Sequence, residues 1–224
     1  MTKRYETIEI YEDLRVKLTT AHFAPGTKLK PSDLQPLYGR SANTLREVLF
    51  RLSTVGLVQF EDQRGFRAQP SDRRRQHDLA SFRITLEQVG AAQSMRNGGI
   101  EWEARLTAAH YKLSHIENRI AASGDITGIV VPWCTAEWEF HETLVSASDS
   151  PLLRSTFQSI YDQFRQQLVT KERNYGYFPR NVAEHAHIVE CALAADAAAL
   201  QQAIHDHLSR NLLENQPAGR SSAM

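Results

Sequence analysis

The sequence predicts a mainly α-helical protein, in which three helices and a β-hairpin form a winged helix-turn-helix and an all-helical bundle follows. Three observations predict this class. Apolar residues recur every three or four positions over most of the chain, strand-like runs occur only in the first third, and proline or glycine marks the breaks. The 224 residues are enough for two modest domains. We expect a winged domain over residues 1–70, a helical domain over 71–214 and a flexible tail over 215–224.

Three helices are expected before the hairpin, over residues 5–22, from near Pro31 to before Gly39, and over residues 42–55. The first and third have apolar residues at helical spacing on one face. Pro25-Gly26 ends the first helix, because proline followed by glycine favours a turn, and Gly56 is the expected C-cap of the third. Two short strand-like runs, over residues 57–60 and 65–68, then predict the hairpin.

The chain from residue 71 onward shows helical periodicity and no strand-like alternation. Ser71 is the expected N-cap of the first helix of this part. Six helices are expected, over residues 72–95, 100–122, 132–148, 151–171, 181–195 and 197–213. This pattern predicts a helical bundle.

The overall charge is zero, but it is unevenly distributed along the chain. Residues 1–75 carry 14 Lys/Arg and 9 Asp/Glu, a balance of +5, whereas the other 149 residues carry 12 and 17, a balance of −5. A basic first third indicates contact with a polyanion, unless the asymmetry is chance scatter of surface charge. No apolar run approaches the roughly 20 residues that span a membrane. The two cysteines lie far apart, no signal peptide is evident, and we expect a cytoplasmic protein without a membrane partner.

The segment from residue 32 to residue 57 predicts a helix-turn-helix, whose second helix can enter a DNA major groove about 12 Å wide. Arg46 can make a bidentate contact to guanine, Asn43 one to adenine, and Thr44 can reach a phosphate or a thymine methyl. Arg64 at the hairpin tip can reach the minor groove or the backbone. The candidate DNA-binding residues are Arg40, Ser41, Asn43, Thr44, Arg46, Arg64 and Gly65. Helical hairpins with an exposed arginine also occur in proteins that bind no DNA, so these residues alone leave the function open.

Residues 7–69 resemble the GntR family of bacterial regulators in the order and spacing of five elements. The matching residues are Pro25-Gly26-x-x-Leu29, Asp33-Leu34, Gly39-x-Ser41 with Leu45-Arg46-Glu47-x-Leu49-x-x-Leu52, Gly56-Leu57-Val58 and Arg64-Gly65-Phe66. The resemblance implies a DNA-binding winged helix-turn-helix, with Arg46 as the main base-reading residue and Arg40, Asn43 and Arg64 in support. Ala42 stands where the family usually has arginine, so the operator can differ from the common one.

Four residues of the helical part are candidate metal ligands. Glu137 and His141 are four residues apart and share one face of a helix. His185 and His207, from two later helices, would complete a set of three nitrogens and one oxygen. Such a set suits zinc, nickel, iron, manganese or cobalt, and leaves positions for water or a bound carboxylate. Without further information, helical histidines are more often surface or hydrogen-bonded residues.

Residues 71–210 resemble the FCD branch of the same family, which has a helical sensor domain like that of the fatty-acid regulator. The matching residues are Arg83-x-x-Leu86-Glu87, Phe140-His141, Ser148-Asp149-Ser150-Pro151-Leu152-Leu153, Glu184-His185-x-x-Ile188 and His207-Leu208. The family normally has aspartate where this chain has Glu137, so the geometry or the metal can differ, or the site has lost its metal. Arg83 is either a carboxylate-binding residue of the sensor cavity or a partner of Glu87 at i+4.

These observations predict a transcription regulator, most simply a repressor, and require no catalysis. Two winged helices in a symmetric homodimer would bind a palindromic operator in double-stranded DNA. A small carboxylate effector would contact the metal and Arg83 and change the population of DNA-binding states. One alternative is a helical-bundle metalloenzyme, but the sequence has no HExxH, Gly-x-Ser-x-Gly or paired di-iron motif. Another is a constitutive DNA-binding protein whose helical domain only dimerises.

Overall fold

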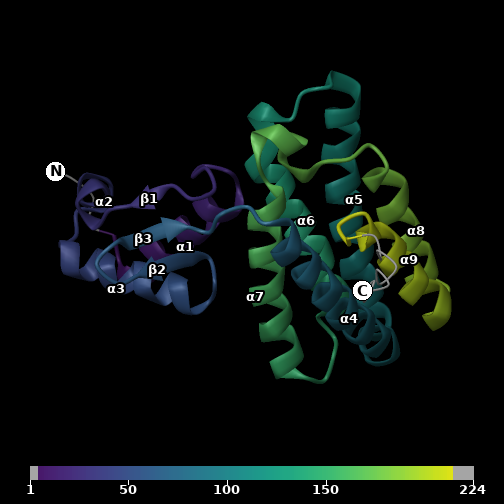
Figure 1. Cartoon of the computed structure of the whole chain (residues 1–224). Helices are drawn as coiled ribbons and strands as arrows, with labels where there is room; N and C mark the ends of the chain where they lie inside the picture. The colour runs from purple at the N-terminus through teal and green to yellow at the C-terminus, as the bar shows by residue number, and fades with distance from the viewer. Residues whose placement is uncertain (1–4, 214–224) are drawn as a thin grey trace, which may run out of the picture.

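The computed structural model describes residues 5–213, apart from the side chains of residues 171 and 173. Figure 1 shows two lobes, a small one with the sheet and a larger one of helices, joined through the segment that follows the hairpin. The tail predicted over residues 215–224 lies outside the described residues. Within the described part of the chain, no helix combines the length and apolar character needed to cross a lipid bilayer.

The first lobe has the predicted order of three helices and a hairpin, with one additional short strand. Its elements are α1 (Thr7–Thr19), β1 (Lys28–Leu29), α2 (Pro31–Tyr38), α3 (Ala42–Thr54), β2 (Val58–Glu61) and β3 (Gly65–Ala68). The strands form an antiparallel sheet in the order β1-β3-β2, in which Leu29 lies opposite Phe66 and Phe60 lies opposite Phe66 on the other side. The hairpin is therefore confirmed, whereas β1 was not predicted.

Helix α3 is positioned by its two ends and by one apolar face. Ser41 is its N-cap, as predicted, and the hydroxyl oxygen of Ser41 accepts a hydrogen bond from the Thr44 amide at 3.2 Å. After the helix, Gly56 has a φ of +75°, a left-handed conformation that glycine adopts without steric cost. The inner face is fully buried in the core of the lobe and consists of Leu45, Val48, Leu49 and Leu52. The opposite face of α3 is left free for solvent or a partner.

The second lobe consists of helices only among the described residues after 71, as predicted. Its long helices are α4 (Arg73–Asn97), α5 (Gly99–Ser123), α6 (Val130–Val145), α7 (Pro151–Leu168), α8 (Asn181–Leu193) and α9 (Ala197–Ser209), with short 3-10 turns over Thr127–Ile129 and Lys171–Gly176. One prediction was wrong: the N-cap of α4 is Asp72, not Ser71. The Asp72 carboxylate accepts from the amides of Arg74 and Arg75 at 2.7 and 3.2 Å, and a charged acceptor binds these amides more strongly than a serine hydroxyl.

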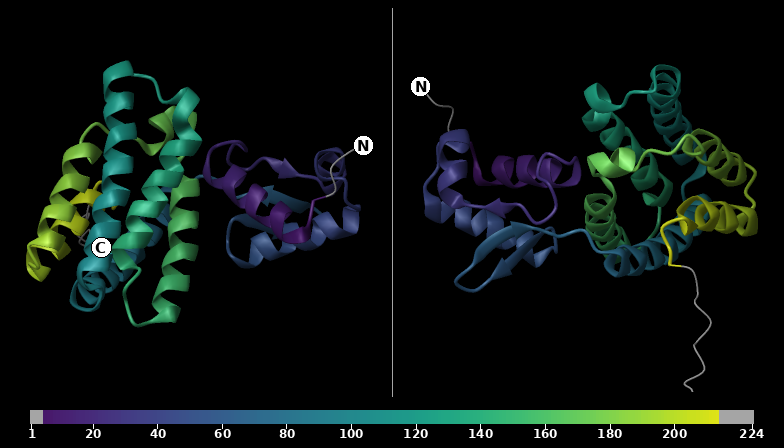
Figure 2. Two further views of the ribbon diagram at one scale, coloured as in Figure 1. Left: turned by 180° about the vertical axis from the view of Figure 1, so that it is seen from behind. Right: turned by 45° about the horizontal axis from the view of Figure 1, so that its top comes forward.

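Helix α7 faces the first lobe (Figures 1 and 2), and α6 and the start of α4 also approach it. Three side chains of α7 take part in the contact, and Arg75 of α4 adds a hydrogen bond to the Gly56 carbonyl oxygen at 3.3 Å. Asp162 pairs with Arg15 of α1, and Gln166 donates from its amide nitrogen to the Leu57 carbonyl oxygen at 2.9 Å. Gln167 bonds to the connecting segment, accepting from the Asp72 amide at 2.9 Å and donating to the Pro70 carbonyl oxygen at 3.1 Å. Because all three residues belong to one helix, a movement of α7 acts directly on the first lobe.

Candidate functional site

The predicted DNA-reading residues lie on or near the free face of α3. Asn43 and Arg46 are exposed on its first two turns, and Thr44 is half-buried with its hydroxyl 2.9 Å from that of Ser41. The side chains that could contact base edges are thus presented to solvent, as a recognition helix requires. Their contact with DNA stays a prediction.

The hairpin tip presents a second predicted group. The Arg64 side chain is 77% exposed and its guanidinium lies 3.1 Å from the Glu61 carboxylate. Gly65 has a φ of +80°, which makes the sharp turn possible. Such a surface ion pair is weak, so Arg64 can exchange Glu61 for a phosphate at little cost.

Arg40, in contrast, is held by its own chain. Its side chain is 15% exposed and pairs with the Glu6 carboxylate at 3.2 Å, while its Nε donates to the Tyr5 carbonyl oxygen. These bonds fix the start of α1 against the turn before α3. A structural role therefore accounts for Arg40, and its predicted contact with DNA would require these bonds to be shared or broken.

A hollow of about 300 Å³ lies between α3 and the hairpin, and two of the side chains that line it are lysines that were not predicted from the sequence. Lys28 and Lys30 are exposed and line this hollow together with Arg46 and Gly65. The sequence feature that could have identified them is the pair of lysines on either side of Leu29, immediately before α2. Three cationic side chains against one carboxylate, that of Asp62, line this concave surface, and the excess of positive charge suits a phosphate backbone.

Three of the four predicted metal ligands come together in the helical lobe. His141 of α6, His185 of α8 and His207 of α9 are buried, and each offers a ring nitrogen within 4.8 Å of those of the other two. The ring centroids are 4.6 to 5.5 Å apart. Residues separated by up to 66 positions are thus placed around one point by the packing of α6, α8 and α9.

Each of these imidazoles is oriented by a carboxylate. The Nδ1 of His141 donates to Glu87 of α4, that of His185 to Glu117 of α5 at 3.2 Å, and that of His207 to Glu184 of α8 at 2.9 Å.

The Nε2 atoms of His141 and His185 are buried and have no hydrogen-bond partner among the described residues. A buried nitrogen without a partner is costly unless a ligand satisfies it. A carboxylate on the far nitrogen of each ligating histidine is the usual outer shell of a protein metal centre, so these residues fit a divalent transition metal.

Burial keeps His141 and His207 in the form that binds metals. Burial, assisted by the positive charge of Arg83, lowers the pKa of His141 well below its ordinary value, and burial does the same for the pKa of His207. Burial acts to raise the pKa of Glu184, but hydrogen bonds from His207 and Arg210 lower it, so this carboxylate stays ionised. Neutral imidazoles need not release a proton before they bind a metal.

The fourth predicted ligand, Glu137, does not join this group of described side chains. Its carboxylate forms an ion pair with Arg165 of α7 at 2.7 Å, and both side chains are almost completely buried. The role of Glu137 as a metal ligand stays a prediction. Arg165 was not identified from the sequence, because one arginine on an amphipathic helix gives no local signal.

A cavity of about 20 Å³ lies beside the histidines. Arg83, Glu137, Phe164, Arg165 and His207 contribute to its lining. This volume holds about one water molecule. Both interpretations of Arg83 fit the structure, because Arg83 pairs with Glu87 at 3.0 Å and also lines the cavity, its guanidinium 5.0 Å from the Phe164 ring.

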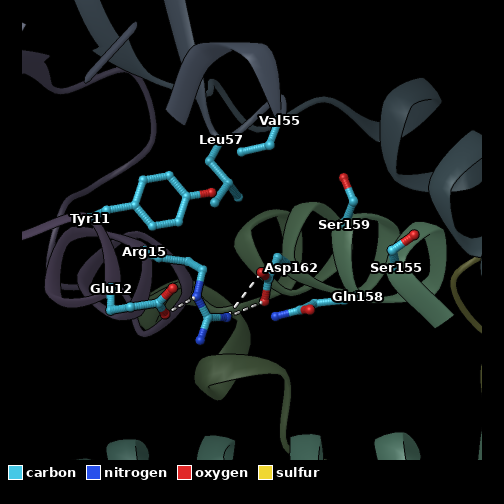
Figure 3. Close-up of a pocket in the computed structure, with 9 residues that line it drawn as sticks. All are labelled: Tyr11, Glu12, Arg15, Val55, Leu57, Ser155, Gln158, Ser159 and Asp162. Atoms are coloured by element: carbon cyan, nitrogen blue, oxygen red, sulfur yellow. Dashed lines mark hydrogen bonds and ion pairs between the residues drawn. The ribbon is translucent and has the colours of Figure 1, made fainter. Parts of the chain in front are cut away.

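A larger hollow, of about 260 Å³, lies between the lobes rather than at the histidines (Figure 3). Its dominant feature is the ion pair in which both oxygens of Asp162 lie 3.0 Å from Arg15, whose Nε lies 2.8 Å from Glu12. We place the candidate ligand site at the histidines, because Arg15, the one cation that lines the larger hollow among the described residues, is already paired with two carboxylates.

The ion pair at this interface is accompanied by different pKa shifts of its two members, Asp162 and Arg15. Burial raises the pKa of Asp162 to about 6 against the attraction of Arg15. Burial acts to lower the pKa of Arg15, but the charges of Asp162 and Glu12 raise it. Burial dominates for Asp162, since a buried carboxylate loses more hydration than a guanidinium that also bonds a partly exposed Glu12.

Two family models match the chain. The model of an FCD domain matches residues 78–210, and that of the bacterial regulatory proteins of the gntR family matches residues 6–67. The chain is 33% identical over 204 residues to the uncharacterized HTH-type transcriptional regulator BphR of Paraburkholderia xenovorans (strain LB400), covering 90% of this chain and 82% of that protein. It is 24% identical over 206 residues to the HTH-type transcriptional repressor GlaR of Escherichia coli (strain K12), covering 90% and 92%.

Solved structures share the fold. E. coli McbR/YncC superimposes with a TM-score of 0.77 at 17% identity, covering 92% of this chain and 94% of its own. A GntR transcriptional regulator from Rhodococcus sp. RHA1 gives a TM-score of 0.71 at 20% identity, covering 91% and 94%. Solved structures therefore contain the same arrangement of the two lobes.

Proposed function

We propose that this chain, which belongs to the gntR family of bacterial regulatory proteins and carries an FCD domain, represses transcription until a small organic acid enters its helical domain. Its family and its relatives are transcription regulators and not enzymes, so the alternative of a helical-bundle metalloenzyme is set aside. In detail, we propose that the chain forms a homodimer in the cytoplasm and acts as a repressor, and that it binds a divalent metal and a small carboxylate effector. We place the division between the two domains at residues 70 and 71.

DNA would be bound by α3 and the hairpin of each subunit. Arg46 and Asn43 would read base edges in the major groove, and Arg64 would contact the backbone or the minor groove. Lys28 and Lys30 would neutralise phosphates beside them. A symmetric dimer would place two copies of α3 about one helical turn of DNA apart, on the half-sites of a palindrome.

The observation that carries the sensor proposal is the set of three buried histidines, each oriented by a carboxylate at Nδ1. His141, His185 and His207 would hold a divalent transition metal through their remaining ring nitrogens. Bound there, such an ion would supply a Lewis-acidic attachment point for an oxygen of the effector. The protein would supply the charge and shape of the cavity, with Arg83 as a guanidinium for the effector's carboxylate.

Helix α7 offers a direct connection between the effector cavity and the DNA-binding domain. Phe164 and Arg165 line the cavity, while Asp162 and Gln166 of the same helix hold Arg15 and the Leu57 carbonyl oxygen of the first lobe. An effector that shifts α7 would thereby change how the two domains are docked, and the population of dimers that fit the operator would fall.

The metal content of purified full-length protein tests this proposal. Plasma mass spectrometry should find about one divalent transition metal per chain in the wild type and a loss of most of it in His185→Ala. The matched control is His205→Ala, which removes an exposed histidine of α9. Wild-type protein without metal, even after incubation with zinc or nickel, would refute the metal proposal and favour a constitutive DNA-binding protein.

A further inference from the structure

Arg165 of α7 is a buried cation whose bonding capacity is only partly used. Its side chain is 3% exposed, and its Nη1 lies 2.7 Å from Glu137. Its Nη2 reaches the sulfur of Cys134 at 3.3 Å, and its guanidinium carbon lies 4.7 Å from the centre of the Trp133 ring. Its Nε is buried and has no acceptor within the described part of the chain. A sulfur and an aromatic face are weak partners, so Glu137 is the main electrostatic partner of Arg165 among the described residues, and the Glu137 oxygen in this pair has no well-aligned hydrogen bond there.

Arg83 of α4 is likewise a buried cation with an unpaired donor, and it lines the same cavity. Its Nε donates to Glu87 at 3.0 Å, whereas its Nη2 is buried and lacks an acceptor among residues 5–213. Unpaired buried donors destabilise the folded protein unless a ligand supplies an acceptor. Two guanidiniums with unused donors in one cavity therefore favour a ligand that brings carboxylate oxygens. The cavity holds only about 20 Å³, so such a ligand enters only if a side chain gives way.

Glu137 is the side chain best suited to give way, because it already occupies the position of a carboxylate on Arg165. We infer that Glu137 is a resident counter-ion of Arg165 that competes with the effector's carboxylate, and not a fourth ligand of an ion held by the three histidines. Arg165 is then a second effector-binding residue beside Arg83, and Glu137 sets the affinity. This inference rests on the proposed effector function.

The space that Glu137 would vacate indicates the class of effector. The cavity itself holds only about 20 Å³, about one water molecule, so the carboxylate of an effector finds room mainly where the Glu137 carboxylate now lies. That place takes one carboxylate group. We therefore expect short monocarboxylates to bind better than dicarboxylates.

The test compares wild type, Glu137→Gln and the double variant Glu137→Gln/Arg165→Gln, all as full-length chains loaded with zinc. Glutamine keeps the size of Glu137 and removes its charge. Calorimetric titrations would use acetate, propionate and glycolate as monocarboxylates and succinate as the dicarboxylate. We expect Glu137→Gln to bind the best monocarboxylate about tenfold more tightly than wild type, the effect of losing one charged competitor for Arg165. The double variant should lose this gain.

Metal content gives a readout that does not depend on the effector. We expect Glu137→Gln to retain the wild-type stoichiometry of metal, because the three histidines suffice.

Loss of the metal in Glu137→Gln, or carboxylate binding that is weaker than or equal to that of wild type, would overturn the inference. Tighter binding of succinate than of every monocarboxylate would overturn the expectation that the site takes a single carboxylate. A wild type that binds metal but no carboxylate would refute the proposed effector, and the inference with it. A wild type without metal would instead refute the proposed metal centre.

Thermal unfolding, followed by circular dichroism, controls for misfolding. Removing both partners of a buried ion pair is tolerated far better than removing one. Glu137→Gln leaves Arg165 without its counter-ion, so we expect it to unfold at a lower temperature than the double variant, and the titrations are run below its unfolding transition.

Discussion

Replacement of Asp162 by asparagine is expected to remove a pH dependence from the stability of the protein. Asp162 lies on α7 with both carboxylate oxygens 3.0 Å from Arg15 of the DNA-binding domain (Figure 3). Burial raises the pKa of this carboxyl from the ordinary value of 3.8 to about 6, against the pull of Arg15. Asparagine keeps the shape and can still accept a hydrogen bond from Arg15, but it carries no titratable proton.

The sign and size of the effect follow from linkage. Between pH values of 3.8 and about 6 the folded protein retains a proton on Asp162 that the unfolded chain has lost. The stabilising contribution of this proton is complete below the unfolded pKa and is lost as the pH rises through the folded pKa. The full difference corresponds to about 3 kcal/mol, of which about 2 kcal/mol falls between pH 4.5 and 7.5.

Urea unfolding of both proteins at several pH values measures this difference. We expect the free energy of unfolding of wild type, relative to that of Asp162→Asn, to fall by about 2 kcal/mol from pH 4.5 to pH 7.5. Asp78→Asn, at an exposed position of α4, should run parallel to wild type. A flat difference, or one that rises with pH, would mean that the attraction of Arg15 outweighs the burial of Asp162.

Three further variants test other parts of the account. Arg46→Ala should weaken binding to a selected operator duplex by about 1–3 kcal/mol and relax the base preference at one position, as measured by fluorescence anisotropy with a panel of duplexes. Lys30→Ala should weaken binding to all duplexes alike and reduce the slope of log affinity against log salt by about 1; an unchanged slope would exclude a phosphate contact. Gly56→Ala should lower the free energy of unfolding by about 1–2 kcal/mol, because an L-residue is strained at this left-handed position. Its Cβ would also lie 2.6 Å from Gln163 Oε1 across the domain contact, and an unaltered urea midpoint would contradict this account.

The sequence was sufficient to predict the elements whose signal is local. The spacing of apolar residues predicted the helices, and the strand-like runs on either side of residues 61–64 predicted the hairpin. Ser41 predicted the start of α3. The structure confirms these elements. Strand β1 could not be found in this way. It has only two residues, Lys28 and Leu29, and is defined by its pairing with β3 rather than by any alternation of its own.

The candidate metal centre was predictable only in part, because its outer groups come from distant helices. The three histidines could be proposed from their resemblance to the FCD pattern, and the structure brings them together. Glu117 of α5 orients His185 across 68 positions, and no spacing rule indicates such a pair. The pairing of Glu137 with Arg165 depends equally on the packing of α6 beside α7, which no local pattern encodes.

The coupling of the sensor to DNA is the central claim, and one titration tests it directly. An operator duplex, selected from a random pool by the wild-type protein, is titrated with zinc-loaded full-length protein in the presence and absence of propionate, and fluorescence anisotropy gives the dissociation constant. We expect propionate to weaken operator binding by wild type at least about tenfold, a typical coupling energy of 1–3 kcal/mol, and to leave binding by His185→Ala unchanged. Equal affinity of wild type with and without propionate, glycolate and acetate would contradict the account and leave a DNA-binding protein that does not respond to these acids.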